Sequence, residues 1–128
     1  MALQLELLPG ELAVSRLDPG DPVPAWALDG PGLVSITRTP SELSLVTGAE
    51  AVPPGVVSAA DWRAFALTGT FDFALTGILA SLLVPLADAG VGIFAFSTYD
   101  TDYLMVREAD LESAVAALRT AGHAVTTA

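Results

Sequence analysis

The chain of 128 residues carries a net charge of −10 and no cysteine, and 52% of its residues are hydrophobic. This length fits one domain or two small lobes, and the apolar content predicts a packed core rather than disorder. The five basic residues are all arginines, which indicates a GC-rich bacterial gene. Because these arginines are scattered along the chain, neither nucleic acid nor an anionic membrane is an expected partner. The lack of cysteine excludes disulfides and thiolate chemistry.

The N-terminal part of the chain is expected to be mostly β-structure. Residues 2–8 alternate leucine with polar residues, which predicts a half-buried strand. A Pro-Gly turn follows, and residues 12–17 are expected to complete a hairpin with the first strand. Residues 24–28 fit one helical turn with a proline at its start. The first residues carry Glu6 and Glu11 where a signal peptide has basic residues, so a cytoplasmic protein is expected.

A second hairpin follows in the first lobe. Residues 33–38 and 42–47 are apolar segments separated by a short turn that contains hydroxyl side chains and proline. Residues 48–55 include Pro-Pro-Gly and are expected to form a connector. The composition changes after this connector. The sequence therefore predicts a degenerate lobe over residues 1–57 and a regular lobe over residues 58–128.

The second lobe shows the clearest periodicity. Residues 61–70 alternate as a strand, and apolar residues then recur every three or four positions, which predicts a helix that ends near Gly90. The apolar face of this helix consists of Leu75, Ile78, Leu79, Leu82, Leu83 and Leu86. Residues 92–106 predict two strands around a polar turn, residues 109–121 a second helix, and residues 123–127 a last short strand.

The predicted element order of the second lobe is β-α-β-β-α-β. In this order two helices cover one face of a four-stranded antiparallel sheet, which is the ferredoxin-like arrangement of the α+β class. Residues 33–46 and 92–106 share an apolar strand, a hydroxyl-rich turn and another apolar strand. This internal similarity predicts two tandem lobes of one kind, of which the first is shortened.

No catalytic constellation stands out in the sequence. The single histidine, His123, lies near the end of the chain and is expected at the surface or at a strand start, since a catalytic base needs a partner that orients it. Ser97 has no base nearby in the sequence. Asp100 and Asp102 do not make a metal site by themselves, although general acid–base work by this pair stays open. Neither an enzyme nor a bound cofactor or metal is expected.

Two features leave a structural and a functional interpretation open. The six polar residues from Ser97 to Asp102 form either a self-satisfied turn or the polar end of a ligand site; Asp100 fits a contact of the Asx-turn type, and Asp102 fits ligand recognition or capping equally. Gly77 lies inside the predicted helix, where glycine costs about 1 kcal/mol relative to alanine. Either the helix packs closely against the sheet there, or bare backbone at the helix start approaches a ligand carboxylate.

These segments resemble the ACT domains of the arginine-sensor (CASTOR-like) group. The resemblance rests on LTGIL at residues 75–79, VPLA at residues 84–87 and the run from residue 96 to residue 111, which contains STYDTDY. Residues 33–43 are similar to the first ACT unit of the same group. ACT domains are β-α-β-β-α-β regulatory modules that bind small molecules, often amino acids, between units. The resemblance therefore implies a regulatory protein without catalytic activity.

The resemblance also implies where a ligand binds. One ACT unit contributes a helix start and a polar strand end, and a second unit contributes the start of its central strand. On this chain the first set is Thr76, Gly77, Thr98, Tyr99 and Asp102, and the second set is Gly92 and Ile93. Asp102 would take a cationic group, and the backbone at Gly77 a carboxylate.

The chain departs from the arginine-sensor group in one respect. The sensors have two copies of the two-lobe unit in tandem, whereas this chain has one. A second chain is therefore expected to supply the missing half, as a homodimer with an amino acid between the protomers. The alternative is an assembly module without a ligand, in which the polar turn caps itself.

Overall fold

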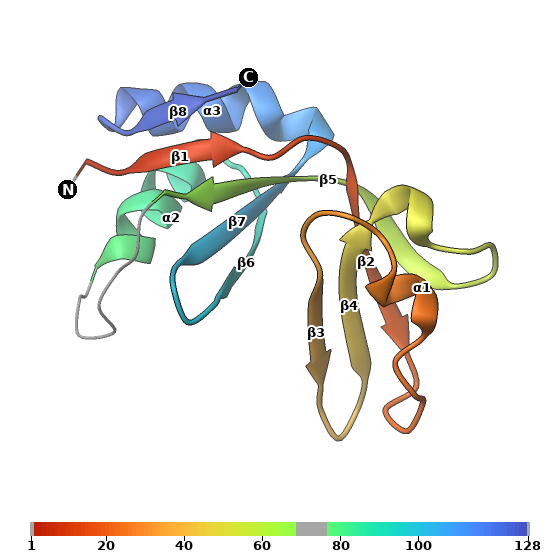
Figure 1. Cartoon of the computed structure of the whole chain (residues 1–128). Helices are drawn as coiled ribbons and strands as arrows, with labels where there is room; N and C mark the ends of the chain where they lie inside the picture. Colours follow the sequence, from red (N-terminus) through yellow and green to blue (C-terminus); the bar gives the residue numbers. More distant parts are fainter. Residues whose placement is uncertain (1, 69–76, 128) are drawn as a thin grey trace. The chain divides into compact units, whose positions relative to one another are not determined.

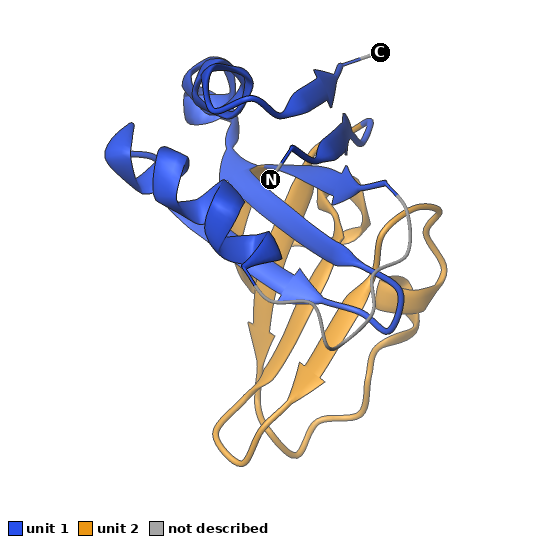
Figure 2. Cartoon of the chain, turned by 90° about the vertical axis from the view of Figure 1, so that its left-hand side faces the viewer, with its two compact units in different colours: residues 1–9, 63–128 blue, residues 10–62 orange. Residues whose placement is uncertain are grey.

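The computed structural model describes residues 2–68 and 77–127 (Figure 1). Contacts between residues divide the chain into two compact units, which Figure 2 shows in different colours. Unit 1 consists of Met1–Pro9 and Arg63–Ala128, and unit 2 consists of Gly10–Trp62. The boundary that the sequence places near residue 57 thus lies inside unit 2, and the first nine residues belong to the unit that contains the C-terminus.

Unit 1 has the element order that the sequence predicts. Its strands are β1 (Gln4–Leu7), the C-terminal part of β5 (Val57–Leu67), β6 (Ile93–Ser97), β7 (Asp102–Arg107) and β8 (Ala124–Thr126). Its helices are α2 (Ile78–Asp88), the short 3-10 helix η2 (Glu108–Asp110) and α3 (Leu111–Thr120). The strands pair in the order β8-β1-β5-β7-β6. From β5 onward the order is β-α-β-β-α-β, which confirms the ferredoxin-like α+β fold.

The core of unit 1 lies between its sheet and its two helices. Leu82 and Leu86 of α2 and Leu118 of α3 are fully buried in one cluster with the alternating leucines of β1. This confirms the predicted apolar face of α2, in which Leu79 and Leu83 are partly buried at the margin; Leu75 lies outside the described residues. The spacing of three and four residues places these side chains on one side of the helix.

The expected hairpin between the first two strands is wrong. β1 pairs antiparallel with β5 and parallel with β8, whereas β2 (Leu12–Leu17) pairs with β4 (Leu43–Gly48) and with the N-terminal part of β5. Alternation predicts which face of a strand is buried, but it does not predict the partner strand. β1 therefore adds a fifth strand to the sheet of unit 1, between β5 and β8.

Both long helices end at a glycine in the left-handed conformation. Gly90 has φ of 76° and Gly122 has φ of 99°, a region that favours residues without a side chain. The residue after each glycine donates its N–H to the carbonyl five positions earlier, at 2.9 Å for Val91 and 3.0 Å for His123. This is the Schellman ending of a helix. The predicted stop of α2 at Gly90 is thus confirmed, and Pro85 lies inside the helix without ending it.

Unit 2 is a smaller version of the same arrangement. Its elements are β2, α1 (Ala25–Leu28), β3 (Ser35–Arg38), β4, the 3-10 helix η1 (Ala49–Ala51) and the N-terminal part of β5. The strands pair antiparallel in the order β3-β4-β2-β5. η1 stands where unit 1 has its second helix, so the expected shortening is confirmed. The small core contains Ala27, Leu43 and Leu45. In the described parts of the chain, no helix is long and apolar enough to cross a membrane.

Candidate ligand-binding site

The candidate site lies at the closed end of the β6–β7 hairpin. The last pair of this antiparallel ladder joins Ser97 and Asp102. Ala95 and Leu104, two positions back on each strand, pack in the core against the helices. Because side chains alternate between the faces of a strand, Ser97 and Asp102 lie on the same face of the sheet as this core. The hairpin therefore places one carboxylate at the end of the sheet, on the side of the helices.

The turn between the strands is closed by Thr98. Its N–H donates to the carbonyl of Thr101 at 2.8 Å, and its Oγ1 accepts the N–H of Thr101 at 3.3 Å. The Thr101 hydroxyl donates to the carbonyl of Leu67, at the end of β5, at 3.1 Å. The turn contact expected from Asp100 is therefore made by Thr98 instead. The hydroxyls of Thr98 and Thr101 are thus engaged within the fold.

Asp102 is half-buried, and its Oδ1 accepts a hydrogen bond from the Ser97 hydroxyl. Two ion pairs join described residues to each other, Arg16–Glu42 and Arg63–Glu108, and neither of them includes Asp102. An ionised carboxylate has two oxygens and can accept about four hydrogen bonds. Asp102 thus has capacity left for a cationic group, which would find a carboxylate that no arginine neutralises.

Gly77 lies just before α2 and not inside it, which corrects its predicted place within the helix. It is the N-cap residue with φ of 78°, and a Cβ built there meets nothing within 4 Å. The left-handed backbone, rather than close packing, thus explains the glycine. The first turn of α2 has neither a side-chain cap nor an acidic residue among the described residues, so its N–H groups suit an anion such as a carboxylate. Thr76 lies outside the described residues.

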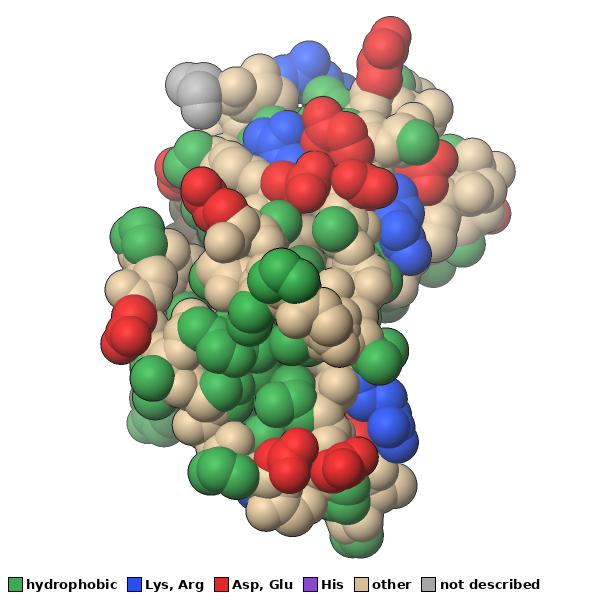
Figure 3. Space-filling model, turned by 90° about the vertical axis from the view of Figure 1, so that its right-hand side faces the viewer, with side chains coloured by type: hydrophobic (Ala, Val, Ile, Leu, Met, Phe, Trp, Pro, Cys, Tyr) green, Lys and Arg blue, Asp and Glu red, His purple; other side chains and the backbone are tan. Residues whose placement is uncertain are grey.

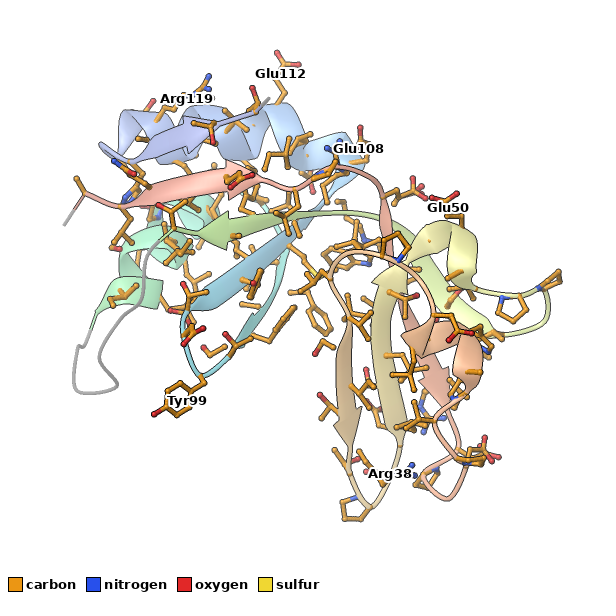
Figure 4. The ribbon with its side chains drawn as sticks, in the orientation of Figure 1. Arg38, Glu50, Tyr99, Glu108, Glu112 and Arg119 are labelled. Atoms are coloured by element: carbon orange, nitrogen blue, oxygen red, sulfur yellow. The ribbon has the colours of Figure 1, made fainter. Side chains whose placement is uncertain are left out.

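The remaining predicted residues lie at two distant places. Tyr99 is 81% exposed and points away from the tip of the hairpin (Figure 4). Gly92 and Ile93 lie at the opposite end of β6, and Ile93 is 37% exposed. Ile93 and Ser97 are four positions apart on β6, which corresponds to about 13 Å along the strand. The fold thus brings Thr98, Tyr99 and Asp102 together on one hairpin, but it leaves Gly92 and Ile93 apart from them within one chain.

Ser97 is the functional candidate that sequence reasoning did not assign. Its position opposite Asp102 follows from the register of the ladder, which a four-residue turn between two strands would have indicated.

On the face shown in Figure 3, arginine side chains lie apart from one another among acidic ones. Among the residues that the structure describes, no group of three or more histidine, aspartate or glutamate side chains could hold a metal ion.

Residues 57–120, half of the chain, match the sequence model of the ACT domain. The chain belongs to the ACT domain family. The matched range contains β5, α2, β6, β7 and α3. Residues 10–55 match a second model, which is described as an N-terminal domain. The family assignment agrees with the ferredoxin-like order of unit 1.

The chain is similar to several known proteins. A crystal structure from Agobacterium tumefaciens is 41% identical, with a TM-score of 0.94 over 100% of this chain and 95% of that one. The regulatory subunit of aspartate kinase from Thermus thermophilus, at 14% identity and a TM-score of 0.66, shares the fold over 94% of this chain and 99% of its own. Human cytosolic arginine sensor for mTORC1 subunit 1 is 33% identical in an alignment of 88 residues that covers 60% of this chain.

The chain spans 27% of the length of that human sensor subunit. The chain is thus an ACT domain protein whose sequence is similar to part of the arginine sensors.

Proposed function

We propose that this ACT domain protein is a cytoplasmic regulatory protein that binds an amino acid between the two protomers of a homodimer. The observation that carries this proposal is the half-buried carboxylate of Asp102, which has no cationic partner among the described residues and lies opposite Ser97, the last residue of the open edge strand β6. The relatives support the proposal, because one is named a cytosolic arginine sensor and another a regulatory subunit.

The edge strand β6 pairs only with β7 among the described strands. Native proteins usually protect such an edge with charged residues, proline or a bulge. Residues 92–97, GIFAFS, contain neither charge nor proline. The edge strand β3 of unit 2, by contrast, ends at Arg38 and is followed by Pro40. The edge of β6 is therefore suited to pairing with the same strand of a second copy.

The register of such a pair would bring the two predicted sets of residues together. Antiparallel pairing of two β6 strands about Ala95 would place Ile93 of one protomer opposite Ser97 of the other, and Gly92 opposite Thr98. The residues that lie about 13 Å apart in one chain would then meet across the two-fold axis. Gly92 has neither a positive φ nor an atom within 4 Å of a built Cβ. Close approach of a partner or ligand would explain why position 92 is a glycine, which the contacts within the single chain do not explain.

The charges of the site complement those of an amino acid, which carries an ammonium group and a carboxylate. In the proposed complex Asp102 accepts hydrogen bonds from the ammonium group or from a cationic side chain, and the free N–H groups at the start of α2, next to Gly77, bind the carboxylate. Thr76 and Tyr99 would line the same site. A ligand held by both protomers stabilises the dimer by mass action.

A second candidate is an assembly module that dimerises through β6 and binds no ligand. The bonds of Thr98 within its own turn favour this candidate, because they leave the hydroxyl already engaged. In this case Asp102 serves only to cap Ser97 at the end of the ladder.

Calorimetric titration with each of the twenty amino acids, together with the mass in solution from light scattering, tests the proposal. We expect one ligand per chain in a dimer. The variant Asp102→Asn keeps an acceptor for Ser97 but removes the charge, and it should weaken binding by at least about tenfold. Asp100→Asn, which removes the same charge from an exposed turn residue, should leave binding unchanged. A dimer that binds none of the twenty would support the assembly module.

A further inference from the structure

His123 is a buried side chain that uses both of its ring nitrogens. It is 5% exposed, although the sequence predicts a surface or strand-start residue. The N–H of Leu3 donates to Nδ1 at 3.1 Å, and Nε2 lies 2.9 Å from the carbonyl oxygen of Ser81. A backbone N–H can only donate and a carbonyl can only accept. The proton of the neutral ring therefore lies on Nε2, which donates to Ser81.

The carbonyl of Ser81 receives no hydrogen bond from the backbone of its own helix, because of Pro85. In an α-helix the N–H of residue 85 would donate to the carbonyl of residue 81, and proline has no N–H. α2 continues through Pro85 to Asp88, so the missing bond lies inside the helix. A buried carbonyl without a partner is unfavourable. The imidazole of His123, which follows the end of α3, supplies the donor that α2 itself lacks.

The other partner of the ring belongs to the N-terminal strand. Leu3 directly precedes β1, which lies between β5 and β8 in the sheet, and its carbonyl accepts the N–H of Ala124 at 2.9 Å. His123 itself is held by the Schellman ending of α3. One ring thus joins β1 to α2, elements that are 120 and 42 residues away from it in the sequence.

We propose that His123 couples the seating of β1 in the sheet to the integrity of α2 at its proline, so that the two elements open together. When β1 leaves, Nδ1 loses its donor and the ring loses the restraint that holds Nε2 against Ser81. When the ring turns away, Leu3 loses its acceptor and Ser81 has no donor to replace it. This coupling does not depend on any ligand.

Two single-sided variants separate the contacts. In His123→Asn the short amide can place its oxygen near the position of Nδ1 and accept from Leu3, but it does not reach Ser81. In His123→Gln the longer amide can donate to Ser81, and it removes the acceptor from Leu3. Amide hydrogen exchange, followed by NMR on the full chain, reports each partner: the Leu3 amide reports β1, and the Ser81 and Leu82 amides report the proline-containing stretch of α2.

In the wild type, coupling predicts a common free energy of opening for the Leu3 amide and the α2 amides. In His123→Gln the Leu3 amide should exchange about three- to tenfold faster than the α2 amides, and in His123→Asn the order should reverse. Adding Pro85→Ala restores a helix N–H for Ser81. In the His123→Asn background it should therefore restore the protection of the α2 amides against exchange. In the His123→Gln background it should leave the Leu3 amide unprotected. Exchange that is alike in both variants, or that Pro85→Ala does not rescue, would show that His123 only fills space and would overturn the proposal.

Discussion

Thr39 in unit 2 and Thr98 in unit 1 close their hairpins with the same hydrogen bonds. Each donates its N–H to the carbonyl three residues later at 2.8 Å, and each accepts the N–H of that residue on Oγ1, at 3.1 Å for Thr39 and 3.3 Å for Thr98. The first strand residue after the turn differs, because it is the buried Leu43 in unit 2 and Asp102 in unit 1. At the first strand position after the turn, the repeated hairpin therefore has a carboxylate in unit 1 and an apolar side chain in unit 2.

The two threonines should contribute equally to stability. Replacing Thr98 by valine removes the acceptor for the Thr101 N–H, and replacing Thr39 by valine removes the same bond in unit 2. Each change is expected to lower the free energy of unfolding by about 0.5 to 1 kcal/mol, because water replaces part of an exposed bond. Urea denaturation measures the effect, with Thr37→Val on exposed β3 as a control that should cost nothing. A neutral Thr98→Val would contradict the role given to this side chain.

Two glycines of the candidate site should respond differently to alanine. Gly77→Ala forces a side chain into a backbone with φ of 78° and is expected to lower the free energy of unfolding by about 1 to 2 kcal/mol. Gly92→Ala meets neither a positive φ nor a nearby atom in the chain, so the melting temperature of the monomer should not change. Under the proposed function, Gly92→Ala weakens the dimer, which sedimentation at several concentrations detects.

The hydroxyl of Ser15 is a buried polar atom whose replacement should be harmless. Ser15 is 1% exposed, and its Oγ has no hydrogen-bond partner among the described residues. Ser15→Ala should leave the free energy of unfolding unchanged or raise it by up to about 1 kcal/mol. The buried Thr47 of the same unit donates to the carbonyl of Gly48 at 3.0 Å, so Thr47→Val should lower it by about 1 kcal/mol. Equal losses in both variants would refute this assignment.

The two described ion pairs should contribute different amounts to the free energy of unfolding. The side chain of Arg63 is 19% exposed, lies 3.2 Å from the Glu108 carboxylate and donates to the carbonyl of Leu8 at 3.4 Å. Arg63→Met should lower the free energy of unfolding by about 1 to 2 kcal/mol, since it leaves both acceptors without this donor. Arg16, with its side chain 56% exposed beside Glu42, is the matched control. Arg16→Met should change stability by less than about 0.5 kcal/mol, and chemical denaturation compares the two.

Local signals in the sequence predicted the elements of unit 1 well. The spacing of Leu82 and Leu86 predicted the buried face of α2, and Gly90 and Gly122 predicted the ends of both helices. These features depend on residues three to five positions apart, so a single stretch of sequence contains the physical cause. The hairpin that carries Asp102 was predicted for the same reason.

The wrong predictions concern contacts between distant segments and one helix start. The alternating leucines of β1 fit any apolar sheet face, so they could not predict pairing with β8, whose residues lie 120 positions away. His123 was expected at the surface or at a strand start. It directly precedes β8, but its burial could not be predicted, because its partners come from β1 and α2 and leave no local pattern. The role of Gly77 depends on where α2 begins, and the start of a helix is weakly marked when no side chain caps it.

β5 is the last strand of unit 2 and also a strand of unit 1, and this double use limits how the chain can be divided by genetic engineering. A cut between Trp62 and Arg63 severs one continuous strand, and a fragment that begins at Val57 omits β1 and leaves a gap between β5 and β8. Neither unit can therefore be transplanted alone as a cassette. Chimeras between members of this group should exchange loops within a unit and keep the full length of β5 together with the N-terminal strand.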